Sequence, residues 1–348
     1  MTKDGIAALL NLEGEKEKEL FRLALETKLR YTGKKVYLRG IVELGNICAK
    51  NCLYCGIRRD NAALPRYQMS AEEIVRAALW AYEGGYGSVV LQSGERSGED
   101  FIALIESALS EIREKTAGKL AVTLSLGEQS ARTYKRWLDA GARRYLLRIE
   151  TSDPQLYEKL HPPDHSFAAR LECLHILRDL GYQLGTGVMI GLPYQTIDQL
   201  AGDIVFFRKM DVDMIGMGPY IASEGAPLAS LGGGGERNFS LSLKMIAAAR
   251  LEMPDVNIAA TTALQALHPQ GRELGIQAGA NVVMPNITDV KYRRLYQLYD
   301  GKPCLDENAQ HCRACLERRI ISAGGEAAPG DPGDPLHYSR RMRRKNYL

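Results

Sequence analysis

Short apolar runs alternate with amphipathic stretches along most of this chain, and this alternation restricts the fold more than any other feature. Each run has the length of a strand, and helix-start signals such as the capping box at Ser70 and Glu73 lie between the runs. The eight strand candidates are residues 36–44, 88–92, 120–124, 145–149, 184–190, 214–217, 258–262 and 281–284.

Strands that alternate with helices form parallel sheets, and eight of them predict an α/β fold with a closed parallel (β/α)8 barrel of the TIM type. An open doubly wound sheet is the alternative, but its usual G-x-G-x-x-G motif is absent after every strand candidate. We therefore expect four regions, which are an N-terminal helical segment (1–35), the barrel (36–300), a second cysteine region (301–322) and a Pro/Gly-rich basic tail (323–348).

Charge and hydropathy exclude several classes of partner. The net charge is +3, which is too small for a strong field toward nucleic acid. No apolar run approaches the roughly 18 residues of a membrane span, and residues 1–20 are too charged for an export signal. We expect a cytoplasmic protein without nucleic-acid or membrane partners.

Two segments carry no assigned chemistry. Residues 323–335 are rich in glycine and proline and are interpreted as a linker-like tail, and the basic run 340–345 as a solvated end. His161 and His165 flank two prolines and are expected at the surface.

Six of the seven cysteines fall into two tight triplets, which indicates metal binding rather than a disulfide framework. Cys48, Cys52 and Cys55 have the spacing C-x3-C-x2-C and directly follow the first strand candidate, where barrels place their chemistry. Three thiolates leave one iron of a four-iron cluster open to a small molecule. A structural zinc site is the alternative, but no fourth cysteine or histidine occurs between Cys55 and His161.

The second triplet, Cys304, Cys312 and Cys315, has the spacing of another metal site. An iron–sulfur cluster of the 2Fe-2S or 4Fe-4S type is favoured, although His311 leaves a Cys3His zinc site open. Cys173 lies among leucines of a helix and is predicted to be a buried apolar residue.

The first triplet, with an aromatic residue before its last cysteine, resembles the signature of the radical S-adenosylmethionine (SAM) superfamily. The resemblance implies a 4Fe-4S cluster whose open iron binds SAM, and reductive cleavage of SAM to methionine and a 5′-deoxyadenosyl radical. Ser93 replaces the first glycine of the family's Gly-Gly-Glu segment, which is a departure from the pattern. The cofactor-binding residues implied in this way are Tyr54, Ser93, Glu95, Glu150, Arg170, Met189 and Tyr296.

Longer segments, spread over roughly residues 10–320, are similar to the HydE family of FeFe-hydrogenase maturases in the biotin synthase-like branch. These segments are residues 52–61, 91–95, 123–128, 144–151, 260–263 and 295–299. The resemblance implies maturation of the hydrogenase active-site cluster, with radical attack at the sulfur of an organometallic substrate, a cysteine-bound iron carbonyl/cyanide precursor. It also implies a low-potential electron donor such as ferredoxin or flavodoxin, and sister maturases as partners. Some members carry an auxiliary cluster at a second C-x7-C-x2-C triplet.

The substrate residues that this resemblance implies combine a cation with hydroxyl groups, which suits an anionic ligand. They are Thr123, Arg148, Thr261, Thr262 and Tyr299. The threonines can equally be β-branched strand residues without a function. Two other functions stay open, a small-molecule radical enzyme of the methylornithine synthase or biotin synthase type and a non-catalytic iron–sulfur scaffold.

Overall fold

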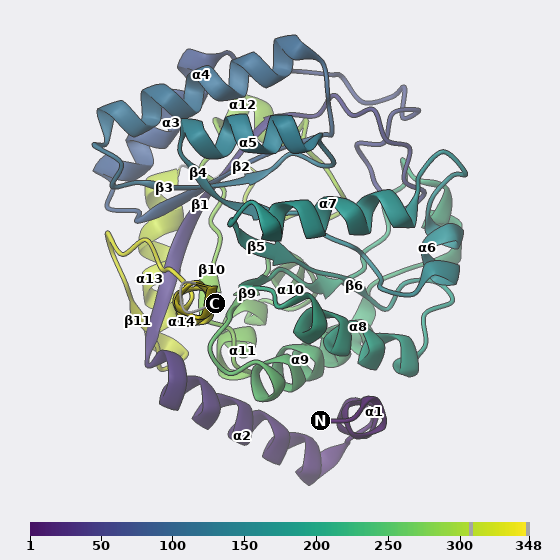
Figure 1. Cartoon of the computed structure of the whole chain (residues 1–348). Helices are drawn as coiled ribbons and strands as arrows, with labels where there is room; N and C mark the ends of the chain where they lie inside the picture. Colours follow the sequence, from purple (N-terminus) through teal and green to yellow (C-terminus); the bar gives the residue numbers. More distant parts are fainter. Residues whose placement is uncertain (306–308, 346–348) are drawn as a thin grey trace.

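The computed structural model of the chain describes residues 1–305 and 309–345. Its centre is a closed barrel of parallel strands surrounded by helices (Figure 1). The barrel strands are β1 (Lys35–Gly45), β2 (Ser88–Ser93), β3 (Ala121–Ser125), β4 (Ala142–Leu146), β5 (Gln183–Thr186), β7 (Met214–Ile215), β9 (Asn257–Ala260) and β10 (Val282–Val283). The barrel closes because β10 pairs with β1, with Tyr37 opposite Val282. The predicted (β/α)8 barrel is confirmed, and the open doubly wound sheet is wrong.

Helices cover the outside of the barrel between successive strands (Figure 1). The predicted helix start is present as a complete capping box, because Ser70 accepts from the Glu73 amide, and a second box has Thr196 accepting from the Gln199 amide. The helices after β1 are α3 (Ala71–Glu83), α4 (Glu99–Lys115), α5 (Ala131–Ala140), α6 (Pro154–Leu160), α7 (Phe167–Asp179), α8 (Ile197–Met210), α9 (Gly235–Glu252), α10 (Thr262–Leu267), α11 (Gly271–Gln277), α12 (Val290–Arg293) and α13 (Ala309–Ser322).

The N-terminal segment is helical, as predicted, and forms two helices. These are α1 (Lys3–Leu10) and α2 (Gly14–Thr32), which ends at Gly33 with φ +71°. They pack on α8 and α9, on the outside of the barrel (Figure 1).

The interpretation of residues 323–335 as a linker-like tail is wrong. The strand β11 (Glu326–Ala327) pairs in parallel with the start of β1. The chain then crosses the end of the barrel where the strands begin, and the Gly333 carbonyl accepts hydrogen bonds from Arg39 at 3.0 Å and from Asn257 at 2.8 Å. Glycine and proline here shape a turn whose carbonyls satisfy buried donors of the barrel floor.

The interpretation of the basic run 340–345 as a solvated end is also wrong, because this run belongs to a helix that packs on the barrel. The helix α14 (Leu336–Lys345) lies across the same end of the barrel (Figure 1). The Arg341 side chain is 5% exposed and pairs with Asp213 at 2.6 Å, while His337 contacts the same carboxylate at 3.0 Å. The C-terminal segment therefore closes the barrel at the end opposite the cysteine loop.

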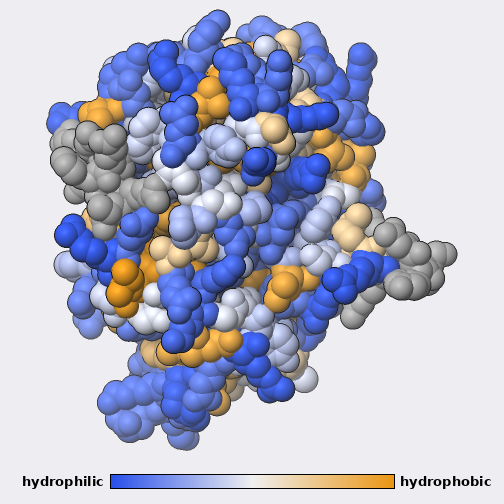
Figure 2. Space-filling view, turned by 90° about the vertical axis from the view of Figure 1, so that its left-hand side faces the viewer, coloured by the Kyte–Doolittle hydropathy of each residue, from blue (hydrophilic) through white to orange (hydrophobic). Residues whose placement is uncertain are grey.

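Apolar side chains are concentrated in the barrel core. Figure 2 shows one face of the molecule, on which hydrophilic residues predominate and hydrophobic residues occupy small separate areas. Within the described ranges, no helix combines the length and the apolar character needed to cross a bilayer.

Candidate active site

The first cysteine triplet lies at the end of the barrel where the strands finish, in the loop that follows β1. The loop after β2 packs closely against it, because a side chain on Gly94 would meet the Ile47 carbonyl at 2.4 Å and Cys48 Cβ at 2.8 Å. The Glu95 amide donates to the Cys48 sulfur at 3.4 Å. Two strand ends therefore combine to shape the surroundings of the triplet.

The three thiols of this triplet lie together, and none forms a disulfide. Burial raises the pKa of Cys48, raises that of Cys52 to about 12, and raises that of Cys55, which is also raised by its two neighbours. A cationic iron cluster would reverse this effect, because thiols that bind metal ionise. No three His, Cys, Asp or Glu side chains of the described residues form a single-ion site. This soft donor set fits a cluster in which each thiolate binds a different iron.

Arg66 holds the cysteine loop in shape. Its guanidinium donates to five backbone carbonyls at 2.6–3.2 Å. The acceptors belong to Asn46, Ile57, Arg58, Arg59 and Asn61. The loop is tied further by Asn51, whose side-chain amide donates to Asp60 at 2.5 Å. Sequence analysis missed Arg66, because an isolated arginine in a loop carries no motif.

We expect Arg66→Ala to impair cluster binding. Hydrogen bonds from a charged donor contribute about 1.5–3 kcal/mol each, so their joint loss should loosen the whole loop. Iron content after anaerobic reconstitution should fall at least about twofold, on the scale of a few kcal/mol of lost loop stability. Arg66→Lys should give an intermediate value, since an ammonium cannot replace the planar fork. The exposed Arg76 of α3 offers the control Arg76→Ala, and full iron in both alanine variants would contradict the role.

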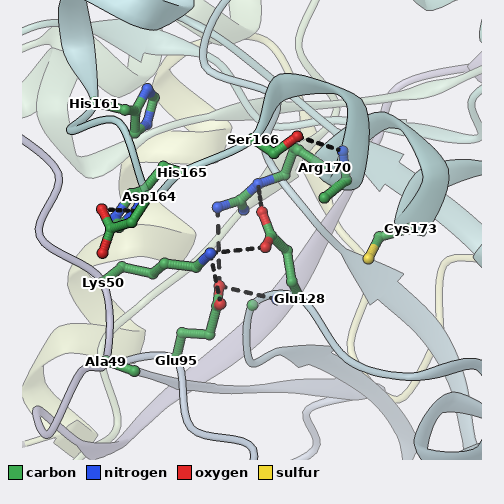
Figure 3. Close-up of polar contacts among 12 residues, drawn as sticks. Ala49, Lys50, Glu95, Glu128, His161, Asp164, His165, Ser166, Arg170 and Cys173 are labelled. Atoms are coloured by element: carbon green, nitrogen blue, oxygen red, sulfur yellow. Dashed lines mark hydrogen bonds and ion pairs between the residues drawn. The ribbon is translucent and has the colours of Figure 1, made fainter.

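Four charged side chains point toward one another next to the cysteine loop (Figure 3). Lys50 lies 2.8 Å from Glu128 and 3.4 Å from Glu95, and Arg170 lies 2.7 Å from Glu128 and 3.8 Å from Glu95. Their side chains are 11–18% exposed. The Glu128 amide also donates to Glu95 Oε2 at 2.9 Å. We call Lys50, Glu95, Glu128 and Arg170 the four-charge cluster.

The four-charge cluster is suited to a ligand with both an amino and a carboxylate group. Its formal charge is zero, and burial raises the pKa of Glu95. The Arg170 Nε–Glu128 contact is an ion pair whose angles lie outside those of a hydrogen bond, so bonding capacity remains at both atoms. Glu95 and Arg170 were predicted from the sequence, whereas Lys50 and Glu128 were not. Their signal was position, since Lys50 lies within the triplet and Glu128 shortly after β3.

Glu150 adopts a backbone conformation that is uncommon for a side-chain-bearing residue, with φ +64°. Its carboxyl is buried, which raises its pKa, and it lies 2.9 Å from Arg148 Nη2 without hydrogen-bond geometry. The predicted strand at 145–149 is wrong in its bounds, because β4 ends at Leu146 and Glu150 instead forms a bridge with Val188. The direction of this carboxylate is therefore set by the left-handed backbone of Glu150 and its bridge to Val188, and not by regular strand geometry.

Asp203 of α8 supports the segment after Glu150, since its carboxylate accepts from the Ser152 amide at 2.6 Å. Burial raises the pKa of Asp203 from its ordinary value of 3.8 to about 7. Between those pH values the folded state binds more protons than the unfolded chain, so this group lowers stability as pH rises.

We expect Asp203→Asn to be more stable than the parent protein at pH 8, by about 2 kcal/mol, because the amide avoids the buried charge. At pH 4 the difference should be small, because the carboxyl is then protonated in the fold and the pH is close to the unfolded pKa of 3.8. Urea unfolding of both proteins at the two pH values measures this, and an equal difference at both would refute it.

Tyr54 and Met189 lie in one small apolar cluster, as expected for two residues on the same side of a cofactor. The Tyr54 hydroxyl is 3.1 Å from His161 Nε2 and lies beside the Cys52 thiol. Its contact with that thiol offsets part of the rise in the Cys52 pKa that burial causes. The surface placement of His161 and His165 is wrong, because they are 4% and 7% exposed. Burial lowers the pKa of His161 to about 3.

Two of the predicted substrate hydroxyls are free to bind. The Thr123 and Thr261 hydroxyls are buried without a hydrogen-bond partner among the described residues, whereas Thr262 accepts from Arg272 at 3.1 Å. Thr261 and Thr262 follow the end of β9 at the start of α10, so they are not strand residues. Thr123 lies on β3 and lines a small, mainly apolar cavity inside the barrel.

The remaining predicted residues have local partners. Ser93 donates to the Gly94 carbonyl at 2.6 Å, which uses its hydroxyl. The buried Tyr296 hydroxyl accepts from Gln92 at 3.1 Å. Burial raises the pKa of Tyr299, which lies within the electrostatic reach of Arg148.

The second triplet is only partly within the described structure. Cys304 and Cys315 are half-buried, and the Cys304 carbonyl accepts from Arg293 at 3.1 Å. The side chains of His311 and Cys312 lie outside the described residues. Whether the three thiols meet is therefore left as a prediction from their spacing.

Comparisons with known proteins agree with this geometry. A family model described as the Radical SAM superfamily matches residues 42–207. The chain is 48% identical over 305 residues to the [FeFe] hydrogenase maturase subunit HydE of Thermotoga maritima, covering 88% of this chain and 85% of that one. Methylornithine synthase (PylB) shares the fold with a TM-score of 0.81 at 24% identity, covering 94% of both chains. The FeFe-hydrogenase maturase HydG of Carboxydothermus hydrogenoformans gives 0.80 at 21% identity, covering 94% of this chain and 76% of that one.

Proposed function

Since this chain belongs to the radical SAM superfamily, we propose that it cleaves SAM reductively as an enzyme of FeFe-hydrogenase maturation. The observation that carries the proposal is the meeting of three buried thiols with the four-charge cluster at the strand ends. The 48% identity to a HydE maturase favours this role over that of methylornithine synthase, whose solved structure is 24% identical.

In this proposal Cys48, Cys52 and Cys55 hold a 4Fe-4S cluster. When bound, the cluster and SAM supply the electron and the 5′-deoxyadenosyl radical on which the chemistry depends. Arg170 pairs with the methionine carboxylate, and Glu95 receives the methionine amine. The role of Arg170 uses the hydrogen-bonding capacity that remains at its Nε.

The nucleoside part of SAM would be held by residues on the other side of the loop. Tyr54 and Met189 pack in one apolar cluster that would exclude water from the adenine. Glu150 would accept from ribose hydroxyls, because its buried Oε2 has no hydrogen-bond partner among the described residues. Tyr296 borders the site from the side of Gln92.

We propose further that the substrate is an anionic organometallic compound, a cysteine-bound iron carbonyl/cyanide precursor attacked at sulfur. The unpartnered hydroxyls of Thr123 and Thr261, together with Arg148, would bind it, with Thr262 and Tyr299 at its edge. Ferredoxin or flavodoxin would supply electrons, and sister maturases would supply the substrate. A second cluster at Cys304, Cys312 and Cys315 belongs to the same proposal. The free thiols of the six cysteines that the structure describes fit a reducing cytoplasm.

Anaerobic reconstitution followed by dithionite and SAM tests the chemistry, with 5′-deoxyadenosine as the readout. Activation of an apo-hydrogenase in an extract that lacks only its HydE maturase tests the role. Both should succeed. Formation of 5′-deoxyadenosine without hydrogenase activation would indicate a small-molecule radical enzyme. Absence of both would indicate a non-catalytic iron–sulfur scaffold.

A further inference from the structure

Three hydrogen-bond donors of the cysteine loop are taken up by one short segment, residues 160–165, between α6 and α7. The Asn51 amide donates to His165 Nε2 at 2.9 Å. The Leu53 amide donates to the Leu160 carbonyl at 3.0 Å. The Tyr54 hydroxyl is 3.1 Å from His161 Nε2. All three donors lie between the first and last cysteines of the triplet.

The hydrogen-bond partners determine the tautomer of each histidine. His161 Nδ1 is 2.9 Å from the Tyr157 carbonyl, which can only accept, so Nδ1 carries the proton and Nε2 accepts from Tyr54. His165 accepts from an amide at Nε2, so its proton lies on Nδ1, 3.0 Å from Asp164 (Figure 3). Both rings therefore present an acceptor to the loop.

Packing holds the two acceptors in place. The His161 ring stacks on Tyr157 with centroids 3.9 Å apart and an angle of 22° between the ring planes. Leu160 is fully buried, and both histidines are nearly so. The segment is also turned back on itself, because the His165 amide donates to the Pro162 carbonyl at 3.0 Å. A buried, folded segment of this kind can fix the loop rather than follow it.

Hydrogen bonds to the sulfurs of an iron–sulfur cluster help to set its reduction potential, and donors near the sulfurs raise it. Several donors of the fold already reach the sulfurs, namely the Glu95 amide at 3.4 Å from Cys48 Sγ, the Lys50 amide beside Cys48 and the Ile57 amide beside Cys55. The Asn51 and Leu53 amides are directed to His165 and Leu160 instead, and the Tyr54 hydroxyl is shared between His161 and the Cys52 sulfur.

We propose that residues 160–165 are a positioning element that withholds the Asn51 and Leu53 amides from the cluster, draws the Tyr54 hydroxyl toward His161, and so keeps the reduction potential of the cluster low. The inference rests on the proposed function, because the loop must hold a cluster. A low potential is what reductive cleavage of a sulfonium compound requires. His161 and His165 act through the loop and are positioning residues, not catalytic ones.

The test is an EPR-monitored redox titration of the reconstituted holoenzyme and its variants. His165→Leu frees the Asn51 amide and should shift the potential to a more positive value. His165→Asn keeps an acceptor and should recover part of that shift. His268→Leu is the matched control, since that ring stacks on Phe239 away from the loop and its loss should shift nothing.

A second variant keeps the proposal testable if His165→Leu does not fold. His161→Phe preserves the stack on Tyr157 but frees the Tyr54 hydroxyl, and it should shift the potential in the same direction. Faster hydrogen–deuterium exchange in the peptide 48–59 of His165→Leu should accompany the change. Unchanged potentials in both variants, at full iron content, would overturn the proposal. The unmodified protein tests the proposed function separately. That function would fail if this protein bound no cluster or made no 5′-deoxyadenosine.

Discussion

Replacement of Cys52 by alanine is expected to abolish formation of 5′-deoxyadenosine from SAM, by at least ~10³-fold, the scale of removing a group on which a chemical step depends. Two thiolates cannot hold a four-iron cluster with a single open iron, so the loss acts on the cofactor itself. Anaerobic assay with dithionite, with iron content and EPR measured on the same sample, checks the result.

Two other cysteines provide controls for this experiment. Cys173 is buried on α7, where its sulfur lies 3.7 Å from the Gln129 carbonyl, so Cys173→Ala should retain cleavage. Cys312→Ala, in the second triplet, should leave most of the activity. Cleavage that survives Cys52→Ala would contradict the assignment of the first triplet.

Replacement of Arg170 by methionine should have the second-largest effect, because it removes a buried cation that two carboxylates share. Breaking a buried ion pair from one side costs about 3–5 kcal/mol of stability. Loss of two charged hydrogen bonds to the methionine carboxylate should raise the KM for SAM on the order of 100-fold. Thermal unfolding and steady-state kinetics measure the two effects separately.

A double variant separates the structural role of Arg170 from its role toward the ligand. Glu128→Gln removes the charge that Arg170→Met leaves unpaired, so the pair of changes should recover stability. It should not recover the KM for SAM, because the cation for the ligand carboxylate is still missing. Recovery of both would show that Arg170 supports the site without touching SAM.

The strand and helix order could be predicted because each signal is local. Apolar runs with intervening helix-start signals, such as the capping box at Ser70, were enough to predict a closed barrel. The ends of the strands were predicted less accurately at the rim of the barrel, where the strand expected at 145–149 ends at Leu146. There, the bridge of Glu150 to Val188 replaces regular pairing, and no local pattern announces it.

Parts of the candidate site, including Glu95 and Arg170, were predicted from the resemblance of the sequence to the radical SAM superfamily. Arg66 was missed because its role is to satisfy carbonyls whose directions depend on the folded loop. His161 and His165 were placed at the surface because prolines beside them suggest a turn, and nothing in a turn motif says what it packs against.

The amino-acid order by itself determined the period of the apolar residues, the helix starts and the spacing of the cysteines, because each depends on neighbours within a few positions. The tertiary structure alone decided the contacts between distant residues, such as Lys50 with Glu128, Asn51 with His165 and Arg144 with Asp334. These pairs form because barrel closure brings the strand ends and their loops together in space, and charge and hydrogen bonding then act through distance rather than along the chain.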